Sequence, residues 1–213
     1  MAVPLLVVAC AAAAGLAAWA LTGFMRRSAT SDAAILHGPW HVVVAGVLGG
    51  LAGLAPSWVE AVAFTVLAVA SGLLTVVDLA EERLPDVVVL PLAGVTAALL
   101  ALAAWTTGQW PALGRAGLAA LALFALCFAM MVFSPDLGFG DVKLAAVVGA
   151  FGGWFSWGAV LLGFAAAWMT FAVVGLVLLL TRRRERTGSL AFGPFLILGA
   201  VLGVFWAGAV LPW

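Results

Sequence analysis

The sequence predicts an all-α protein, a polytopic bundle of about eight transmembrane helices formed by one integral membrane domain over residues 1–213. Hydrophobic residues make up 66% of the chain and charged residues only 8%, with a mean hydropathy of +1.26. A soluble globular domain has about 25% charged residues. Several apolar runs also reach the length, about 18 residues or more, that a helix needs to cross the hydrocarbon core.

Eight candidate spans follow one another along the chain, at residues 3–25, 41–55, 57–79, 86–106, 112–133, 142–154, 156–180 and 190–211. The second and the sixth are short and glycine-rich. The sixth and seventh form one nearly continuous apolar run, but a single helix of that length would far exceed the thickness of a bilayer. Gly152 and Gly153, followed by Trp154 and Trp157, predict an interfacial turn between the two.

Cysteine use restricts the chemistry. Cys10 and Cys127 lie within apolar runs, where thiols pack as small hydrophobic groups. No C-x-x-C pair occurs, which excludes a zinc site built on cysteines, and nothing in the sequence indicates a metal or another cofactor. The V-V-A-C ending at Cys10 faintly resembles a lipoprotein cleavage site. Because no Lys or Arg precedes this run and it continues to Phe24, we expect a retained first helix rather than a signal peptide.

The basic residues predict the orientation. With eight spans, eight of the nine basic residues fall on one side of the membrane: Arg26, Arg27, Arg83, Lys143, Arg182, Arg183, Arg184 and Arg186. Only Arg115 falls on the other side. The positive-inside rule makes the first side cytoplasmic and places both termini outside. If one of the short spans did not cross the membrane, Arg26 and Arg27 would lie on the opposite side from the later arginines. The formal net charge is zero, so the sequence lacks the excess of positive charge that is typical of nucleic-acid-binding proteins.

Small residues recur at four-residue spacing, which allows helices to approach closely in lipid. The pairs are Gly46 and Gly50, Gly49 and Gly53, Gly149 and Gly153, and Gly199 and Gly203. We use them only to predict a compact helical bundle.

Two aspartates stand at the ends of apolar runs, and the topology above places both at the same membrane face. Asp78 closes S-G-L-L-T-V-V-D, and Asp141 stands in G-F-G-D before V-K-L-A-A-V-V-G-A. A carboxylate at the edge of hydrocarbon is costly, so each is a candidate functional residue. Two carboxylates a few ångströms apart tend to share one proton. One can then activate a water molecule while the other polarises a scissile carbonyl and later helps the amine to depart.

The neighbours of Asp78 have simpler explanations. Pro85 fits the start of a helix, and Asp86 can favour the positive N-terminal end of that helix. Glu81, Glu82 and Arg83 are most simply a solvated turn.

Around Asp141, Gly138 and Gly140 free the backbone to bend and let another helix approach. Asp141 itself could be a plain helix N-cap, and Asp136 is expected to lie in a loop. Lys143 could pair with a carboxylate or extend to lipid phosphate, and the latter is the commoner use.

Three motifs together resemble the prepilin leader peptidases, bacterial aspartyl proteases of the GxGD kind. They are D-L-x-x-x-x-L-P-D at 78–86, G-F-G-D-V-K at 138–143, and G-S-L-A-F-G-P-F at 188–195. The resemblance implies that Asp78 and Asp141 are the catalytic pair. It also implies prepilin or pseudopilin precursors as substrates and partners, with a short basic leader cut on the cytoplasmic side just before a hydrophobic helix. Glu82 and Lys143 are candidates for docking the leader.

The resemblance further implies a multi-pass protein of the bacterial inner membrane, with its active site facing the cytoplasm and the lipid bilayer around it. Larger members carry an insert with two C-x-x-C pairs, associated with N-methylation of the new terminus. This chain has no such insert, so we do not expect the methyltransferase activity. The short form resembles peptidases of tight-adherence or actinobacterial pilus-like systems.

Other functions remain open. An ion- or proton-coupled transporter could use the same aspartates as relay groups, although transporters generally show internal repeats and midplane sites. A degenerate member could serve as a structural partner in pilus assembly. A GxGD protease could also act on other signal peptides by the same mechanism.

Overall fold

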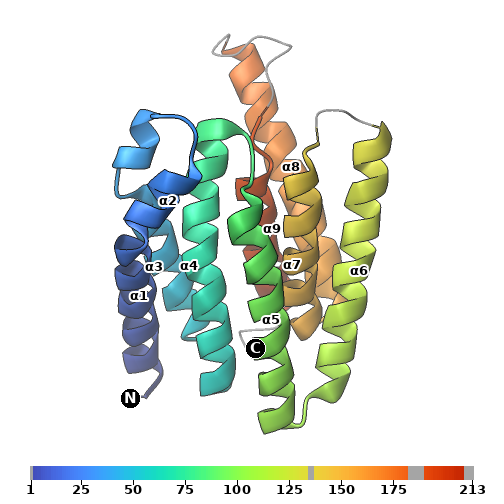
Figure 1. The fold of residues 1–213 in the computed structure, drawn as a ribbon. Coiled ribbons are helices and arrows are strands. Elements are labelled where there is room, and N and C mark those ends of the chain that lie inside the picture. The colour runs from blue at the N-terminus through green and yellow to red at the C-terminus, as the bar shows by residue number, and fades with distance from the viewer. Residues whose placement is uncertain (1, 134–136, 182–189, 209–213) are drawn as a thin grey trace. The chain divides into compact units, whose positions relative to one another are not determined.

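The computed structural model describes residues 2–133, 137–181 and 190–208, and within these ranges the regular structure is entirely helical (Figure 1). The helices are α1 (Ala2–Ala20), α2 (Thr22–Ser28), η1 (Ala34–His37), α3 (Trp40–Ala52), α4 (Trp58–Glu81), α5 (Asp86–Thr107), α6 (Trp110–Phe133), α7 (Phe139–Phe155), α8 (Trp157–Leu180) and α9 (Gly193–Trp206). The prediction of an all-α polytopic membrane protein is confirmed.

Each predicted span overlaps helical structure, the first of them both α1 and α2, and the helices differ in length. Among the described residues, five are long and apolar enough to cross a membrane: α1, α4, α5, α6 and α8. The apolar helices α3 and α9 have 13 and 14 residues, and α7 has 17. At 1.5 Å per residue, α3 extends about 20 Å, less than the roughly 30 Å of the hydrocarbon core. The count of eight complete spans stays a prediction.

The chain divides into two compact units, residues 1–113 and 114–213. Each unit has its own helix packing. The assignment of the whole chain to one peptidase domain stays a prediction.

In the first unit, α1 and α3 pack closely because small residues line their contact. A Cβ at Gly49 would lie 2.7 Å from the Cys10 carbonyl oxygen, and one at Gly53 would lie 2.7 Å from the Val7 nitrogen. The end of α3 therefore lies beside the start of α1, and the two helices are antiparallel. The free thiol of Cys10 is buried.

Helix α4 returns the chain to the end of the unit where α2 lies. The Glu81 carboxylate at the end of α4 accepts hydrogen bonds from Thr30 and Ser31, which follow α2. At the start of α4, Glu60 accepts a hydrogen bond of 3.4 Å from Gln109, which follows α5. Although α3 is short, this path places the Arg26 and Arg83 segments at one end of the unit, in agreement with the charge pattern.

A break between α1 and α2 interrupts the first predicted span. Thr22 Oγ1 donates to the Trp19 carbonyl at 2.6 Å and lies 2.9 Å from His41 Nε2. Since the single hydroxyl proton goes to Trp19, His41 Nε2 is the donor in the second contact. This part-buried bond joins the break between the two helices to α3.

In the second unit, α8 and α9 pack backbone to backbone. A Cβ at Gly163 would lie 3.0 Å from the Gly199 carbonyl oxygen, and one at Gly203 would collide with the backbone at Ala159 and Gly163. Helices α6 and α7 meet similarly, since a Cβ at Gly149 would lie 2.6 Å from the Ala119 carbonyl. These close approaches support the use of the glycine pairs as a sign of tight packing.

We expect Gly203→Ala to lower the free energy of unfolding by about 2 kcal/mol, because the new methyl group forces α8 and α9 apart. Thermal unfolding in detergent measures the change. Gly117→Ala is the matched control, since in the described part of the chain its added Cβ would have no contact within 4 Å beyond its immediate neighbours and its own helix backbone. Equal stability of the two variants would contradict the packing argument.

Arg115 also stabilises the second unit. Its Nε donates to the Gly153 carbonyl at 2.7 Å, and its Nη2 donates to the Trp154 and Phe155 carbonyls at 2.7 and 3.0 Å. These are carbonyls at the C-terminal end of α7, where a cation is favoured. Arg115 therefore has a structural role at the end of α7.

Candidate active site

Asp78 lies in the last turn of α4, in the first unit, and it is buried. The residue is 2% exposed, and its backbone carbonyl accepts a hydrogen bond of 2.7 Å from the Glu82 nitrogen, which closes the helix. A buried carboxylate at the end of an apolar helix is the arrangement that the sequence predicts.

The segment after Asp78 turns sharply and starts the next helix. Glu82 has φ = 53° and is the only described non-glycine residue with a positive φ. Leu84 is buried, Pro85 is the N-cap residue of α5, and Asp86 is its first residue. The backbone roles expected for Pro85 and Asp86 therefore agree with the structure.

We expect Glu82→Gly to fold with a stability within about 1 kcal/mol of wild type, because glycine adopts the left-handed region without strain. Glu82→Val should cost roughly 1–2 kcal/mol more, because a β-branched side chain disfavours that region. Melting temperatures of the two variants in the same detergent measure the difference. A valine variant as stable as the glycine variant would show that this turn tolerates any backbone geometry.

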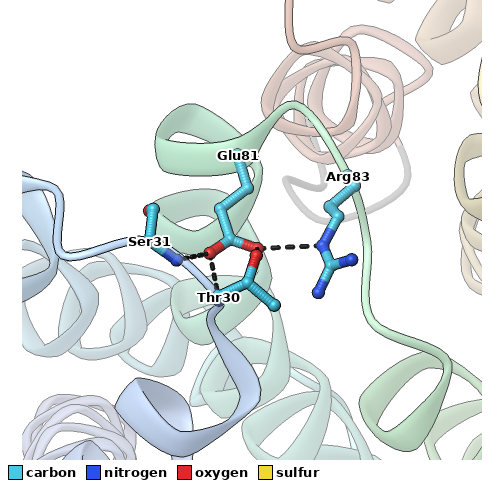
Figure 2. Close-up of polar contacts among 4 residues, drawn as sticks. All are labelled: Thr30, Ser31, Glu81 and Arg83. Atoms are coloured by element: carbon cyan, nitrogen blue, oxygen red, sulfur yellow. Dashed lines mark hydrogen bonds and ion pairs between the residues drawn. The ribbon is translucent and has the colours of Figure 1, made fainter.

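Glu81 corrects the expectation of a solvated turn. Its side chain is only 4% exposed, and its carboxylate accepts hydrogen bonds from the backbone of Thr30 and Ser31, from the Thr30 hydroxyl and from Arg83 (Figure 2). Sequence reasoning missed this role because its partners lie about fifty positions earlier in the chain. No local pattern distinguishes Glu81 from the exposed Glu82.

Asp141 lies in the first turn of α7, three residues after the N-cap Gly138. It is therefore not the N-cap itself. Its Oδ2 accepts a hydrogen bond of 3.3 Å from the Gly138 nitrogen, while its backbone nitrogen donates to the Gly138 carbonyl at 3.1 Å. The other carboxyl oxygen, Oδ1, is buried and has no hydrogen-bond partner among the described residues. Such an atom needs a polar partner, so helix capping explains only one of the two oxygens.

The residues around Asp141 have varied roles. Gly138 has φ = −73° and ψ = 150°, values that any residue adopts, and an added Cβ would lie 3.4 Å from Asp141 Oδ2. The local backbone therefore does not require glycine there. Gly140 lies in the first turn of α7. Lys143 places its ammonium group 4.4 Å from the centroid of the Phe139 ring, a cation–π contact.

The third motif reaches into an aromatic cluster. Gly188 and Ser189 lie outside the described residues, but Phe192 is 4% exposed at the start of α9. Its ring centroid lies 4.7 Å from that of Trp168 and 5.2 Å from that of Phe171, both on α8. These two aromatic residues were not predicted, because they stand in a uniformly apolar run.

The structure thus collects the candidate residues into two groups. Asp78, Glu82, Pro85 and Asp86 belong to the first unit. Gly138, Gly140, Asp141 and Lys143 belong to the second. The pairing of the two aspartates stays a prediction. Asp136 and the arginines at 182–186 lie outside the described residues.

A sequence model of the Type IV leader peptidase family matches residues 62–212, which include both aspartate motifs. The chain belongs to the type IV leader peptidase family. This membership confirms the resemblance that the three motifs predicted. The family match begins within α4, so α1 to α3 lie outside it.

Similar proteins carry the name prepilin leader peptidase/N-methyltransferase. The protein from Aeromonas hydrophila is 31% identical over 170 residues, which are 75% of this chain and 54% of that protein. The protein from Legionella pneumophila is 32% identical over 66% of this chain and 48% of its own length. The protein from Burkholderia pseudomallei is 34% identical over 74% and 50%. This chain spans about half the length of these curated relatives, and no solved structure matches it.

Proposed function

We propose that this protein is a membrane-embedded aspartyl endopeptidase that removes the short basic leader from type IV pilin-like precursors. The family match over residues 62–212 supports a leader peptidase. The observation that carries the assignment of the site is the buried Oδ1 of Asp141, which has no hydrogen-bond partner in the described protein. A second carboxyl group, a water molecule or the substrate would satisfy it.

The proposed chemistry uses Asp78 and Asp141 as a pair that shares one proton. The ionised member takes a proton from a water molecule, whose oxygen attacks the scissile carbonyl carbon. The protonated member donates a hydrogen bond to the carbonyl oxygen. The tetrahedral intermediate then breaks its C–N bond, and a proton from the pair passes to the departing amine. No metal or cofactor takes part in this proposal.

The substrate reaches this site where its helix leaves the bilayer. The proposed orientation places the Arg26 and Arg83 end of the first unit in the cytoplasm, following the positive-inside rule. Glu82 and Lys143 help to dock the basic leader and its flanking segment. The protein then lies in the bacterial inner membrane, with the leader cut on the cytoplasmic side.

The direct test uses purified protein in lipid vesicles with a pilin-like precursor from the same genome. We expect one cut just before the precursor's hydrophobic helix, identified by mass spectrometry of the new N-terminus. The double variant Asp78→Asn/Asp141→Asn is the control and should leave the precursor intact. If wild-type protein cuts none of the pilin-like precursors, the peptidase function is wrong, and the transporter with the same aspartates becomes the next function to test.

The orientation has its own test. In intact cells, a membrane-impermeant maleimide should label Pro56→Cys and leave Asp32→Cys unlabelled until the membrane is opened. Asp32 is 95% exposed at one end of the first unit, and Pro56 is exposed before α4 at the other end. The buried native thiols, Cys10 and Cys127, should contribute little background. Labelling of Asp32→Cys in intact cells would reverse the orientation.

A further inference from the structure

Glu81 joins a segment outside the family match to the turn that follows Asp78. Its Oε1 accepts hydrogen bonds from the backbone nitrogens of Thr30 and Ser31, the latter at 2.6 Å. Its Oε2 accepts from the Thr30 hydroxyl at 3.1 Å and from Arg83 Nε at 2.9 Å. Figure 2 shows the carboxylate between these donors. A nearly buried carboxylate with four donors is a strong, charge-assisted link.

The segment that Glu81 holds is a cap, which we define as residues 25–37: the end of α2, the loop after it, and η1. Below the Glu81 contacts, the cap packs on α4 through a buried apolar cluster. The members of this cluster are Met25 and Leu36 from the cap and Leu73, Val76 and Val77 from α4. Within the cap, Arg26 Nε donates to the Leu36 carbonyl at 3.3 Å. The cap is therefore fixed to the last two turns of α4.

Asp78 lies outside the side of α4 that the cap covers, about 100° round the helix from Val77. The cap-facing residues Leu73, Val76 and Val77 follow helical spacing, and Glu81 stands at the edge of that stripe. Asp78 is one turn before Glu81, about 60° further round the helix. The carboxylate of Glu81 therefore stands between the cap and the position of Asp78, and it restrains the turn that carries both residues.

The Glu81 carboxylate also restrains the turn around Glu82, the residue in the left-handed conformation. Arg83 binds Glu81 across Glu82, whose φ of 53° is an uncommon conformation for a side chain of this kind. Holding the residues on both sides stabilises this turn, which ends α4 directly after Asp78. Without the link, the last turn of α4 can fray, because the ends of helices are their least stable parts.

We propose that Glu81 is a positioning residue: by clamping the cap to the end of α4, it holds Asp78 at the depth and angle that leader removal requires. This inference rests on the proposed function. It gives the N-terminal segment outside the family match a role in the reaction, as the support for the first aspartate.

The test compares Glu81→Ala and Glu81→Gln with Asp32→Asn, which removes an exposed carboxylate from the same cap. The rate of leader removal is measured over a series of precursor concentrations and divided by the concentration of folded protein, which gives kcat and KM. We expect Glu81→Ala to lower kcat about tenfold, with KM within about twofold, because a displaced catalytic group slows chemistry more than binding. Glu81→Gln should fall between, since its amide oxygen still accepts but its NH₂ group cannot. Asp32→Asn should retain wild-type kinetics.

A second precursor, with the basic residues of its leader replaced by glutamine, separates positioning from leader recognition. Positioning predicts the same loss of kcat with both precursors. A rise in KM that disappears with the neutral leader would overturn the proposal and make Glu81 a leader-binding residue. Unchanged kcat in Glu81→Ala would overturn it as well. If Glu81→Ala does not fold, Thr30→Val removes one donor and should still lower kcat measurably.

Hydrogen exchange at Thr30 and Ser31 tests the clamp without reference to activity. Both amides should exchange slowly in wild type and in Asp32→Asn, and much faster in Glu81→Ala. Equal exchange in all three would overturn the clamp itself. If the amides behave as expected but the wild type removes no leader, the proposed function fails and the positioning role fails with it. The two failures are therefore distinguishable.

Discussion

Asp78→Asn and Asp141→Asn should each reduce the rate of leader removal by about 10³-fold, while both variants fold. Asparagine has nearly the same shape as aspartate but cannot exchange a proton, so the pair loses either its base or its acid. General acid–base groups typically contribute 10²–10⁴-fold. The measurement is the rate of precursor cleavage in vesicles under single-turnover conditions.

The pattern of losses is as informative as their size. Because the two carboxyl groups act as one unit, the double variant should be about as slow as either single variant. Asp32→Asn is the control for removal of a charge. Asp32 is exposed, and within the described residues its carboxylate contacts His37. If either single variant cleaved at the wild-type rate, the paired-aspartate assignment would be wrong.

Arg115→Met should lower the free energy of unfolding by about 3 kcal/mol. Methionine preserves much of the side-chain volume but removes the three hydrogen bonds that Arg115 donates to the carbonyls of Gly153, Trp154 and Phe155. A hydrogen bond to a charged group contributes about 1.5–3 kcal/mol. The lost compensation of the α7 dipole adds a smaller amount. Thermal unfolding in detergent, followed by circular dichroism, measures the effect.

Arg27→Met provides the matched control. Within the described residues, Arg27 Nε makes one exposed hydrogen bond, to the Gly23 carbonyl at 3.1 Å, so its replacement should change stability by less than about 0.5 kcal/mol. Arg115→Lys should lie between the two, because an ammonium group cannot reproduce the forked geometry of a guanidinium. Equal stability of Arg115→Met and Arg27→Met would show that the end of α7 does not need its cation.

The helices themselves were predictable from the sequence. A membrane-spanning helix must satisfy its backbone hydrogen bonds internally, so apolar length alone located every described helix of the candidate spans within a few residues. The break at Leu21 and the starts of α7 and α9 were less predictable. At the first of these, Thr22 contacts His41 nineteen positions along the chain, a contact that apolar periodicity does not reveal.

The three motifs predicted the family correctly, because spacing and residue type at 78–86 and 138–143 are properties of the chain alone. They also singled out Asp78, whose low exposure agrees with a functional role. They could not show that one carboxyl oxygen of Asp141 has no hydrogen-bond partner among the described residues. That finding depends on how α7 packs against its neighbours.

By itself, then, the sequence determined the membrane class, the positions of the helices and the family, since each follows from composition or from residues close together in the chain. Only the tertiary structure decided what Glu81 and Arg115 do. Both looked like ordinary charged residues at helix ends. Glu81 binds a segment about fifty positions away, and Arg115 binds carbonyls nearly forty positions away. Because such contacts join residues that are distant in sequence, only folding brings their donors and acceptors together.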